Sequence, residues 1–205
     1  RRVFTNLVDG ELSSAANRVR TGTAGLAEAL STVPEPERDN VINWALGRDV
    51  QDADQDGDRM EPRYDMGDPF HIQPLTVLYS GSIDNQVSTV FLATNDGYLH
   101  AIDADTGVER WAFIPQRLLN GLYTLYRDEA AATKTYGLDG EITLIIMNDD
   151  GQPGLAGSER AILLFGMGRG GDSVFAVDVT SRDAPLLLWE INSSGFRKIQ
   201  WRKPI

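Results

Sequence analysis

The chain contains no cysteine, only two histidines, and fewer basic than acidic residues. The absence of cysteine excludes disulfides, thiol nucleophiles and zinc sites with thiolate ligands. With 19 basic and 30 acidic residues the formal net charge is -11, and this sign argues against a nucleic-acid partner, whose phosphates attract basic surfaces. No apolar run is long enough to span a bilayer.

Signals for catalysis are also scarce. His71 and His100 lie in strand-like sequence without a second histidine at the spacing of a helical metal pair, so we interpret both as structural. No G-x-S-x-G nucleophile motif occurs. The acids at Asp103, Asp105 and Asp139 fall at predicted turns, where aspartate is favoured for backbone reasons. The sequence therefore predicts a protein that is not an enzyme.

A strand–turn–strand pattern occupies residues 94–111. Near-alternating apolar and polar residues precede the turn at Asp105-Thr106-Gly107, and Trp111 ends the second apolar run. The pattern A-x-D-x-x-T-G-x-x-x-W, from Ala101 to Trp111, resembles the blade repeat of quinoprotein-type β-propellers. That resemblance implies that the Asp and Thr side chains hold the turn and that the Trp packs between neighbouring blades.

A second, looser copy follows between residues 175 and 189. It repeats the alanine, aspartate, threonine and tryptophan as Ala176, Asp178, Thr180 and Trp189. One blade cannot bury both of its faces alone, so two copies predict an incomplete β-propeller. Two ordinary hairpins of an unrelated sandwich are the alternative interpretation.

The chain divides into three predicted parts. Residues 1–48 form a helical N-terminal segment, with a short strand at 3–5 and helices at 13–30 and 37–46. Residues 49–66 form an Asp-rich loop, and residues 67–205 form a partial β-propeller with a helical insertion near 116–130. The fold class is thus all-β, preceded by a helical segment. The predicted strands cover 73–79, 87–93, the hairpin at 99–113, a buried strand at 142–147, then 161–165, 174–179 and 186–191.

The Asp-rich loop carries the strongest candidate site. Asp52, Asp54, Asp56 and Asp58 alternate with other residues, and Gly57 occupies the sixth position of a calcium-loop pattern that starts at Asp52. Positions nine and twelve of this pattern are not carboxylates, so the closing ligand has to come from Glu61, Asp65 or elsewhere. We predict a Ca²⁺ site, because four close carboxylates repel one another unless a cation neutralises them. A solvated acidic loop is the alternative.

The run from Gly166 to Gly171 matches the dinucleotide fingerprint G-x-G-x-x-G. That fingerprint requires a helix after the glycines, because the helix N-terminus binds the pyrophosphate. Residues 172–179 instead have the composition of a strand. We therefore reject nucleotide binding and expect the glycines to allow sharp turns near the propeller axis.

In chain order these motifs resemble the C-terminal domain of PilY-type proteins of the type IV pilus. The resemblance covers residues 40–191 and rests on motifs that begin at Asn43, Met66, Ala93, Trp111, Gly166 and Ala176. It implies an exported protein of the pilus tip, cell surface or outer membrane and periplasm. Such a protein promotes pilus assembly, opposes retraction and contributes to adhesion.

The same resemblance implies calcium as cofactor, carried over here to Asp52, Asp54, Asp56 and Asp58. It implies minor pilins of the tip complex and host or surface ligands as partners. We interpret the chain as a piece of a longer protein with further blades. The alternatives are a quinone (PQQ)-dependent dehydrogenase on the same blade type, for which no quinone site is identifiable, and a non-enzymatic scaffold propeller.

Overall fold

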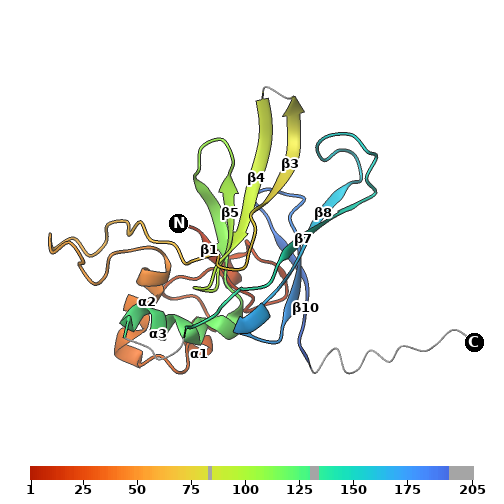
Figure 1. Ribbon diagram of the computed structural model, residues 1–205. Helices are drawn as coiled ribbons and strands as arrows, with labels where there is room; N and C mark the ends of the chain where they lie inside the picture. Colours follow the sequence, from red (N-terminus) through yellow and green to blue (C-terminus); the bar gives the residue numbers. More distant parts are fainter. Residues whose placement is uncertain (83–84, 130–133, 194–205) are drawn as a thin grey trace, which may run out of the picture.

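Two open β-sheets form the body of the protein, and short helices gather at one end of it (Figure 1). The computed structural model describes residues 1–82, 85–129 and 134–193. The first sheet has the order β1-β6-β5-β4-β3, and the second has the order β2-β10-β9-β8-β7. The strands of the first sheet are β1 (Val3–Phe4), β3 (Leu75–Ser82), β4 (Asn85–Ala93), β5 (Leu99–Asp103) and β6 (Glu109–Phe113). Those of the second are β2 (Gly10–Glu11), β7 (Ile142–Met147), β8 (Arg160–Gly166), β9 (Val174–Asp178) and β10 (Leu186–Ile191).

The two predicted repeat copies have the same strand register. Ala101 pairs with Trp111 across β5 and β6, and Ala176 pairs with Trp189 across β9 and β10. Both hairpins carry a bulge immediately before the tryptophan, which increases the local twist and re-aims nearby side chains. The pattern in the sequence therefore corresponds to a repeated structural unit of four consecutive antiparallel strands.

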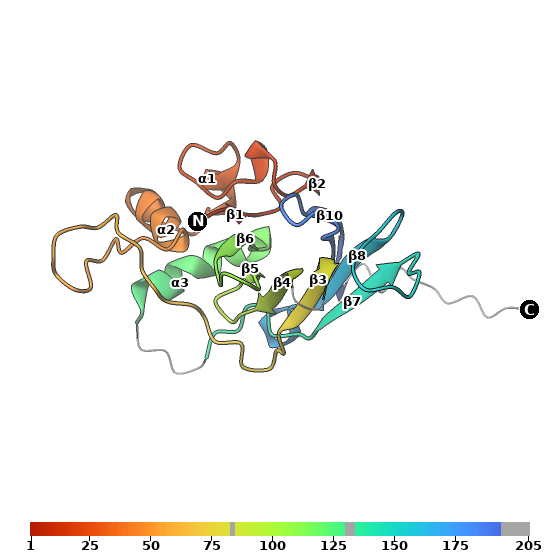
Figure 2. The ribbon, with the colours of Figure 1, turned by 90° about the horizontal axis from the view of Figure 1, so that it is seen from above.

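The N-terminal segment runs along one outer edge of each sheet (Figure 2). β1 pairs in parallel with β6, and β2 pairs antiparallel with β10. Main-chain hydrogen bonds of 2.9 Å from Ala112 to Arg2 and from Ile114 to Phe4 extend this pairing. The short strand predicted at 3–5 is confirmed. Its pairing covers edge groups that would otherwise be open to another chain.

The helix predicted over residues 13–30 is wrong. Only η1 (Ala15–Asn17) and α1 (Leu26–Ala29) form there, because Gly22 and Gly25 both adopt φ 81°, in the left-handed region that interrupts a helix. The helix predicted at 37–46 is confirmed as α2 (Arg38–Ala45), which follows η2 (Glu35–Glu37). The N-terminal 48 residues are therefore a mixture of short helices, short strands and turns.

Helices also occupy the predicted insertion near 116–130, as η3 (Gln116–Gly121) and α3 (Leu122–Arg127). The Tyr126 ring of α3 packs edge-on against Trp44 of α2, with 6.3 Å between ring centroids. Together with α1, these helices enclose a second apolar core beside the sheets. None of the helices in the described ranges is long and apolar enough to cross a bilayer.

The main core lies between the two sheets. Phe113 of β6 packs edge-on against Phe165 of β8 and Phe175 of β9, at centroid distances of 6.4 and 6.1 Å. Burial of rings this large dominates the packing energy of a small domain. The prediction of a buried strand at 142–147 is wrong, because β7 is an edge strand with Ile145 40% and Met147 42% exposed.

The propeller itself is not confirmed. Within the described residues neither sheet closes, and the two sheets lie next to each other with β3 beside β7 (Figure 2). The coarser fold class holds, since the chain is mostly β with a few short helices.

Candidate functional site

The Asp-rich loop projects from the body between α2 and β3 (orange in Figure 1). Its two ends are joined at the base by a bridge between Arg48 and Pro62. Main-chain hydrogen bonds from Asp49 to Glu61 (3.0 Å) and from Arg63 to Gly47 (2.7 Å) flank this bridge. The loop is therefore closed at its base although it contains no long strand.

Three of the four predicted ligands come together. One carboxylate oxygen each from Asp52, Asp54 and Asp56 lies within 4.8 Å of the others. Asp54 also belongs to a second group of this kind with Asp49 and Glu61. Glu61 is one of the closing residues that the sequence suggested, whereas the buried Asp49 was not singled out. Its position as the first residue of the predicted Asp-rich loop was the available signal.

Asp58 does not join either group. Its Oδ1 instead accepts a hydrogen bond of 2.9 Å from the main-chain N–H of Met60. The glycine predicted for the tight turn does adopt a left-handed conformation, with φ 91° at Gly57. The N–H of Gly57 donates to Asp52 Oδ1 at 3.0 Å, so the first and sixth positions of the loop are in contact.

Like charges act on one another inside this loop. Asp54 and Asp56 raise the pKa of Glu61, and desolvation, Asp58 and Asp49 add to the effect. The carboxylate oxygens form the hard donor set that Ca²⁺ prefers, and a divalent cation would remove their mutual repulsion.

A second acidic group lies in the loop between β7 and β8. Oxygens of Asp149, Asp150 and Glu159 lie within 4.8 Å of one another. Glu159 is buried and accepts hydrogen bonds from the N–H groups of Asp150 (2.9 Å) and Ala156 (2.7 Å). This carboxylate therefore organises its own loop. This cluster was not predicted from the sequence.

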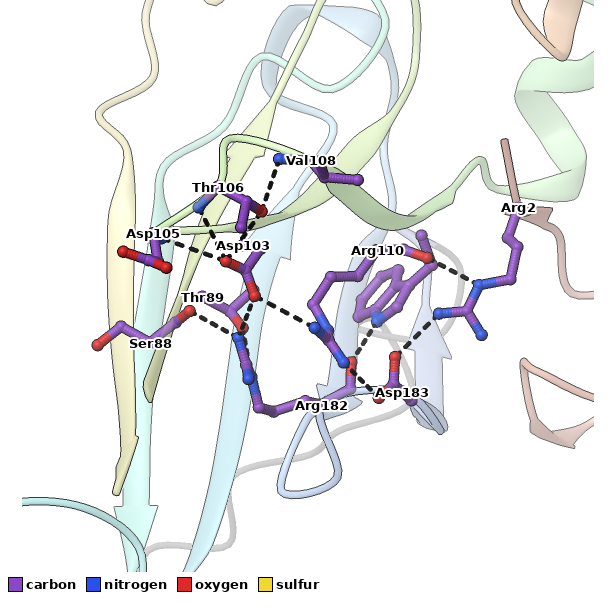
Figure 3. A network of polar contacts seen from close by, with 11 residues as sticks. Arg2, Ser88, Thr89, Asp103, Asp105, Thr106, Val108, Arg110, Arg182 and Asp183 are labelled. Atoms are coloured by element: carbon purple, nitrogen blue, oxygen red, sulfur yellow. Dashed lines mark hydrogen bonds and ion pairs between the residues drawn. The ribbon is translucent and has the colours of Figure 1, made fainter. Parts of the chain in front are cut away.

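A polar network connects the two sheets (Figure 3). Arg182, from the turn between β9 and β10, reaches across to the first sheet. Its guanidinium donates to Asp103 Oδ2 at 2.9 Å, to the carbonyl of Ser88 at 2.8 Å and to Thr89 Oγ1 at 3.2 Å. It also lies 5.4 Å from the ring centroid of Tyr79. One side chain thus bonds to three groups of the neighbouring sheet.

Asp103 holds its own turn as well. Its Oδ1 accepts from the N–H and the hydroxyl of Thr106, both at 3.1 Å. The hydrogen bond from the Thr106 N–H is the largest of the influences that lower the pKa of Asp103 to about 2, with Arg182 adding to it. The role inferred for the Asp and Thr of the repeat is confirmed.

The tryptophan of the first repeat also bridges the sheets. Trp111 is fully buried, and its indole Nε1 donates to the carbonyl of Arg182 at 2.8 Å. The inter-unit packing expected for this residue is confirmed. Trp189, at the same register in the second sheet, is 38% exposed.

Both histidines have hydrogen-bond partners. The buried His100 contacts Glu109 through Nδ1 at 2.7 Å and Thr94 Oγ1 through Nε2 at 3.2 Å, so its structural role is confirmed. His71 Nδ1 lies 2.9 Å from both carboxylate oxygens of Asp139. Asp139 was predicted to serve a turn, but its carboxylate is buried against His71.

The glycine-rich motif leads into η4 (Gly168–Gly170) and then β9. The α-helix that a dinucleotide site needs is not at this position of the described chain. Instead, glycine is required at position 170 because the backbones of Gly170 and Gly137 lie close together. A Cβ at Gly170 would overlap the carbonyl oxygen of Gly137.

Taken together, the fold and contacts define a β protein built from Asp-Thr-Trp hairpin units, with an Asp-rich loop that precedes the first unit. No family model matches the chain. It is 37% identical over 110 residues, and 41% over 109 residues, to two type IV pilus biogenesis factor PilY1 homologs of Xylella fastidiosa. It is 33% identical over 112 residues to the type IV pilus biogenesis factor PilY1 of Pseudomonas aeruginosa strain UCBPP-PA14.

These matches cover 54%, 52% and 54% of this chain but only 8%, 7% and 9% of the respective relatives. The matched half of the chain therefore spans less than a tenth of the length of each of these proteins. The solved C-terminal domain of Pseudomonas aeruginosa PilY1 is 30% identical, with 53% of this chain and 19% of that chain covered and a TM-score of 0.34. The resemblance to PilY-type proteins is confirmed, and the matched half of the chain is related to PilY1.

Proposed function

We propose that this chain is part of an exported type IV pilus biogenesis protein that acts without catalysis. The observation that carries the proposal is the relationship of half the chain to PilY1 proteins at 33 to 41% identity. The protein acts at the pilus tip, on the cell surface, or in the outer membrane or periplasm. It supports pilus assembly, opposes retraction and contributes to adhesion, with minor pilins of the tip complex and surface ligands as partners.

We further propose that the two hairpin units are blades of a propeller with more blades. The contrast between Trp111 and Trp189 supports this architecture. Trp111 is buried because the turn of the next unit covers it and accepts its indole hydrogen bond at Arg182. Trp189 has the same register but is 38% exposed. A following unit of the same type would bury it by the same contact.

Calcium modulates this protein in our proposal, through the Asp-rich loop at residues 49–66. The converging oxygens of Asp52, Asp54 and Asp56, with Asp49 and Glu61 beside them, support a site for one Ca²⁺. Asp58 would contribute through its main-chain carbonyl, the usual ligand at the seventh position. Because the loop joins the N-terminal segment to the β unit, Ca²⁺ would order the connection between these parts.

The pilus role is tested in the organism that encodes the chain. Immunogold labelling of the parent protein on sheared pili and intact cells should place it at pilus tips or on the envelope. If the protein opposes retraction, deletion of its gene should remove surface pili, and blocking retraction in that strain should restore them. Labelling confined to the cytoplasm would contradict the proposal.

The dehydrogenase alternative makes a different prediction. Purified parent protein supplied with the quinone cofactor, calcium and a panel of alcohols and sugars should reduce an electron-accepting dye only if a quinone site exists. We expect no reduction above the level without protein. Turnover above that level would replace the non-catalytic assignment by an enzymatic one.

A further inference from the structure

Three segments that are distant in the sequence meet at one end of the sheets. They are the Gly-Asp-Pro-Phe-His segment at 67–71, the connection at 134–140, and the glycine-rich loop at 166–171. The N–H of Asp139 donates to the carbonyl of Met167, and that of Gly140 to Gly166, both at 3.2 Å. A Cβ at Gly168 would lie 2.7 Å from the Asp139 carbonyl group. The glycines therefore let the third segment dock closely on the second and fix the side chains that both carry.

His71 is oriented by the second segment. Its Nδ1 lies 2.9 Å from both oxygens of Asp139, whose side chain is only 2% exposed. A buried carboxylate accepts a proton donor, so the hydrogen of the imidazole is assigned to Nδ1. The His71 side chain is itself 34% exposed. Its Nε2 is therefore the nitrogen that remains for a partner from outside the protein.

Arg169 is held beside this histidine by an uncharged group. Its guanidinium donates to Tyr136 Oη at 3.1 Å and lies 5.4 Å from the centroid of the same ring. Among the described residues no carboxylate lies within ion-pairing distance of Arg169, in a chain with 30 acidic residues. The neighbouring Lys134, in contrast, is paired with Asp68. Arg169 thus keeps most of its donors available in a fixed position.

Tyr136 connects the two basic side chains. Its ring stacks with the imidazole of His71 at a centroid distance of 6.4 Å and an interplanar angle of 28°. Arg169 lies against the same ring. Phe70, which is 67% exposed and 4.5 Å from the His71 ring, adds an apolar wall. The result is a guanidinium with available N–H groups, held on an exposed aromatic support beside the imidazole of His71.

We propose that the surface formed by His71, Tyr136 and Arg169 binds an oxyanion, the group shared by carboxylates and phosphates. A guanidinium presents two parallel N–H groups that match such an anion, and Arg169 keeps N–H groups available for it beside Tyr136. The chain has a net charge of -11, so attraction of an anion to this surface would come from the local groups and not from the charge of the whole molecule. The site is separate from the Asp-rich loop and does not depend on the proposed pilus role.

Nuclear magnetic resonance of the ¹⁵N-labelled 205-residue chain tests the proposal. The chain is titrated at constant ionic strength with inorganic phosphate and, separately, with N-acetylglutamate, while the ¹⁵N shift of His71 Nε2 is followed. A saturable shift with at least one of the two supports the site, and the tighter binder shows whether a free phosphate or a peptide-like carboxylate is the better ligand. The absence of a saturable shift with both would overturn it.

Variants separate this site from general anion attraction. Arg169→Gln should weaken binding at least about tenfold, the loss expected when a charged hydrogen bond worth about 1.5 to 3 kcal/mol is removed. Tyr136→Phe, which removes the hydroxyl that orients Arg169, should weaken it by a smaller factor. Arg59→Gln, at an exposed arginine of the Asp-rich loop, is the matched control and should leave binding unchanged. Equal affinities in Arg169→Gln and the wild type would overturn the assignment.

Discussion

The guanidinium of Arg182 lies 2.9 Å from Asp103 Oδ2, although the two residues are 79 positions apart in the chain. Each belongs to the turn of a different hairpin unit, and the side chains of Arg182 and Asp103 are only 19% and 17% exposed. Because Asp103 also holds its own turn through Thr106, the contact between the sheets and the local turn share one carboxylate. The packing of one unit on the other is thereby tied to the geometry of the repeat.

Replacing this arginine should weaken the contact between the sheets. We expect Arg182→Ala to lower the free energy of unfolding by about 2 kcal/mol, because Arg182 loses its hydrogen bonds to three groups of the first sheet and Asp103 keeps its charge without this partner. Urea denaturation measures this change. The slope of the unfolding free energy against urea concentration should stay the same as in the wild type. Arg20→Ala, at an exposed arginine, is the control. Equal losses in both variants would contradict the role of the network.

The two repeat tryptophans should differ in their contribution to stability. Trp111→Phe removes buried ring volume and the hydrogen bond to the carbonyl of Arg182, and should cost about 2 kcal/mol. Trp189→Phe, at the same register but partly exposed, should cost less than about 0.5 kcal/mol in this chain. Thermal and urea unfolding of both variants provide the comparison. Similar losses would mean that the exposed tryptophan is already packed in solution.

The sequence predicted the repeat well because its signals are local. Alternating residues, the Asp-Thr-Gly turn and the tryptophan together define two hairpins whose registers match, and the helix α2 follows from acidic residues at its start and apolar ones on one side. The helix predicted at 13–30 failed because Gly22 and Gly25 override the apolar spacing. The pairing of β1 and β2 with strands more than a hundred residues away could not be predicted, because it produces no periodic pattern in the sequence.

For the sites too, residues that are close in the sequence were recognised, and contacts between distant residues were not. The Asp-rich loop was found because its carboxylates follow one another in the sequence. The contact between His71 and Asp139 was not found, because the two residues are separated by 68 positions and each fits a different local explanation. A buried strand was wrongly predicted for residues 142–147, because an apolar run alone does not show whether a strand is central or at the edge of its sheet.

Acid should destabilise the protein through Glu109. Burial raises the pKa of Glu109, but hydrogen bonds from His100 and Arg1 outweigh it and lower that pKa to about 2, from an ordinary value of 4.5. A carboxyl whose pKa is lower in the folded state stabilises the fold above its ordinary pKa, and this stabilisation is lost as the pH falls from 4.5 towards 2. In Glu109→Gln the unfolding free energy should be lower at neutral pH and fall less steeply across this interval. Glu28→Gln, at an exposed glutamate, should follow the wild-type profile, whereas equal slopes in wild type and Glu109→Gln would contradict the account.

Calcium should bind to the Asp-rich loop with a dissociation constant of about 10⁻⁴ to 10⁻³ M, the range of extracellular calcium modules. Binding should raise the melting temperature, because only the folded loop brings the carboxylates together. The variant with Asp54→Asn and Asp56→Asn should lose both the calorimetric heat and the stabilisation. Asp149→Asn, in the acidic loop between β7 and β8, is the control. Equal heats and melting shifts in the double variant and the wild type would place any calcium site elsewhere.

The central claim is that this chain is part of a pilus biogenesis protein, and the amount of pilin on the cell surface tests it most directly. The gene is deleted in the organism that encodes it, and sheared surface pilin is quantified by immunoblot against total pilin. The account predicts that surface pilin falls severalfold while total pilin stays constant, and that the wild-type gene restores it. Unchanged surface pilin in the deletion strain would contradict the proposed function.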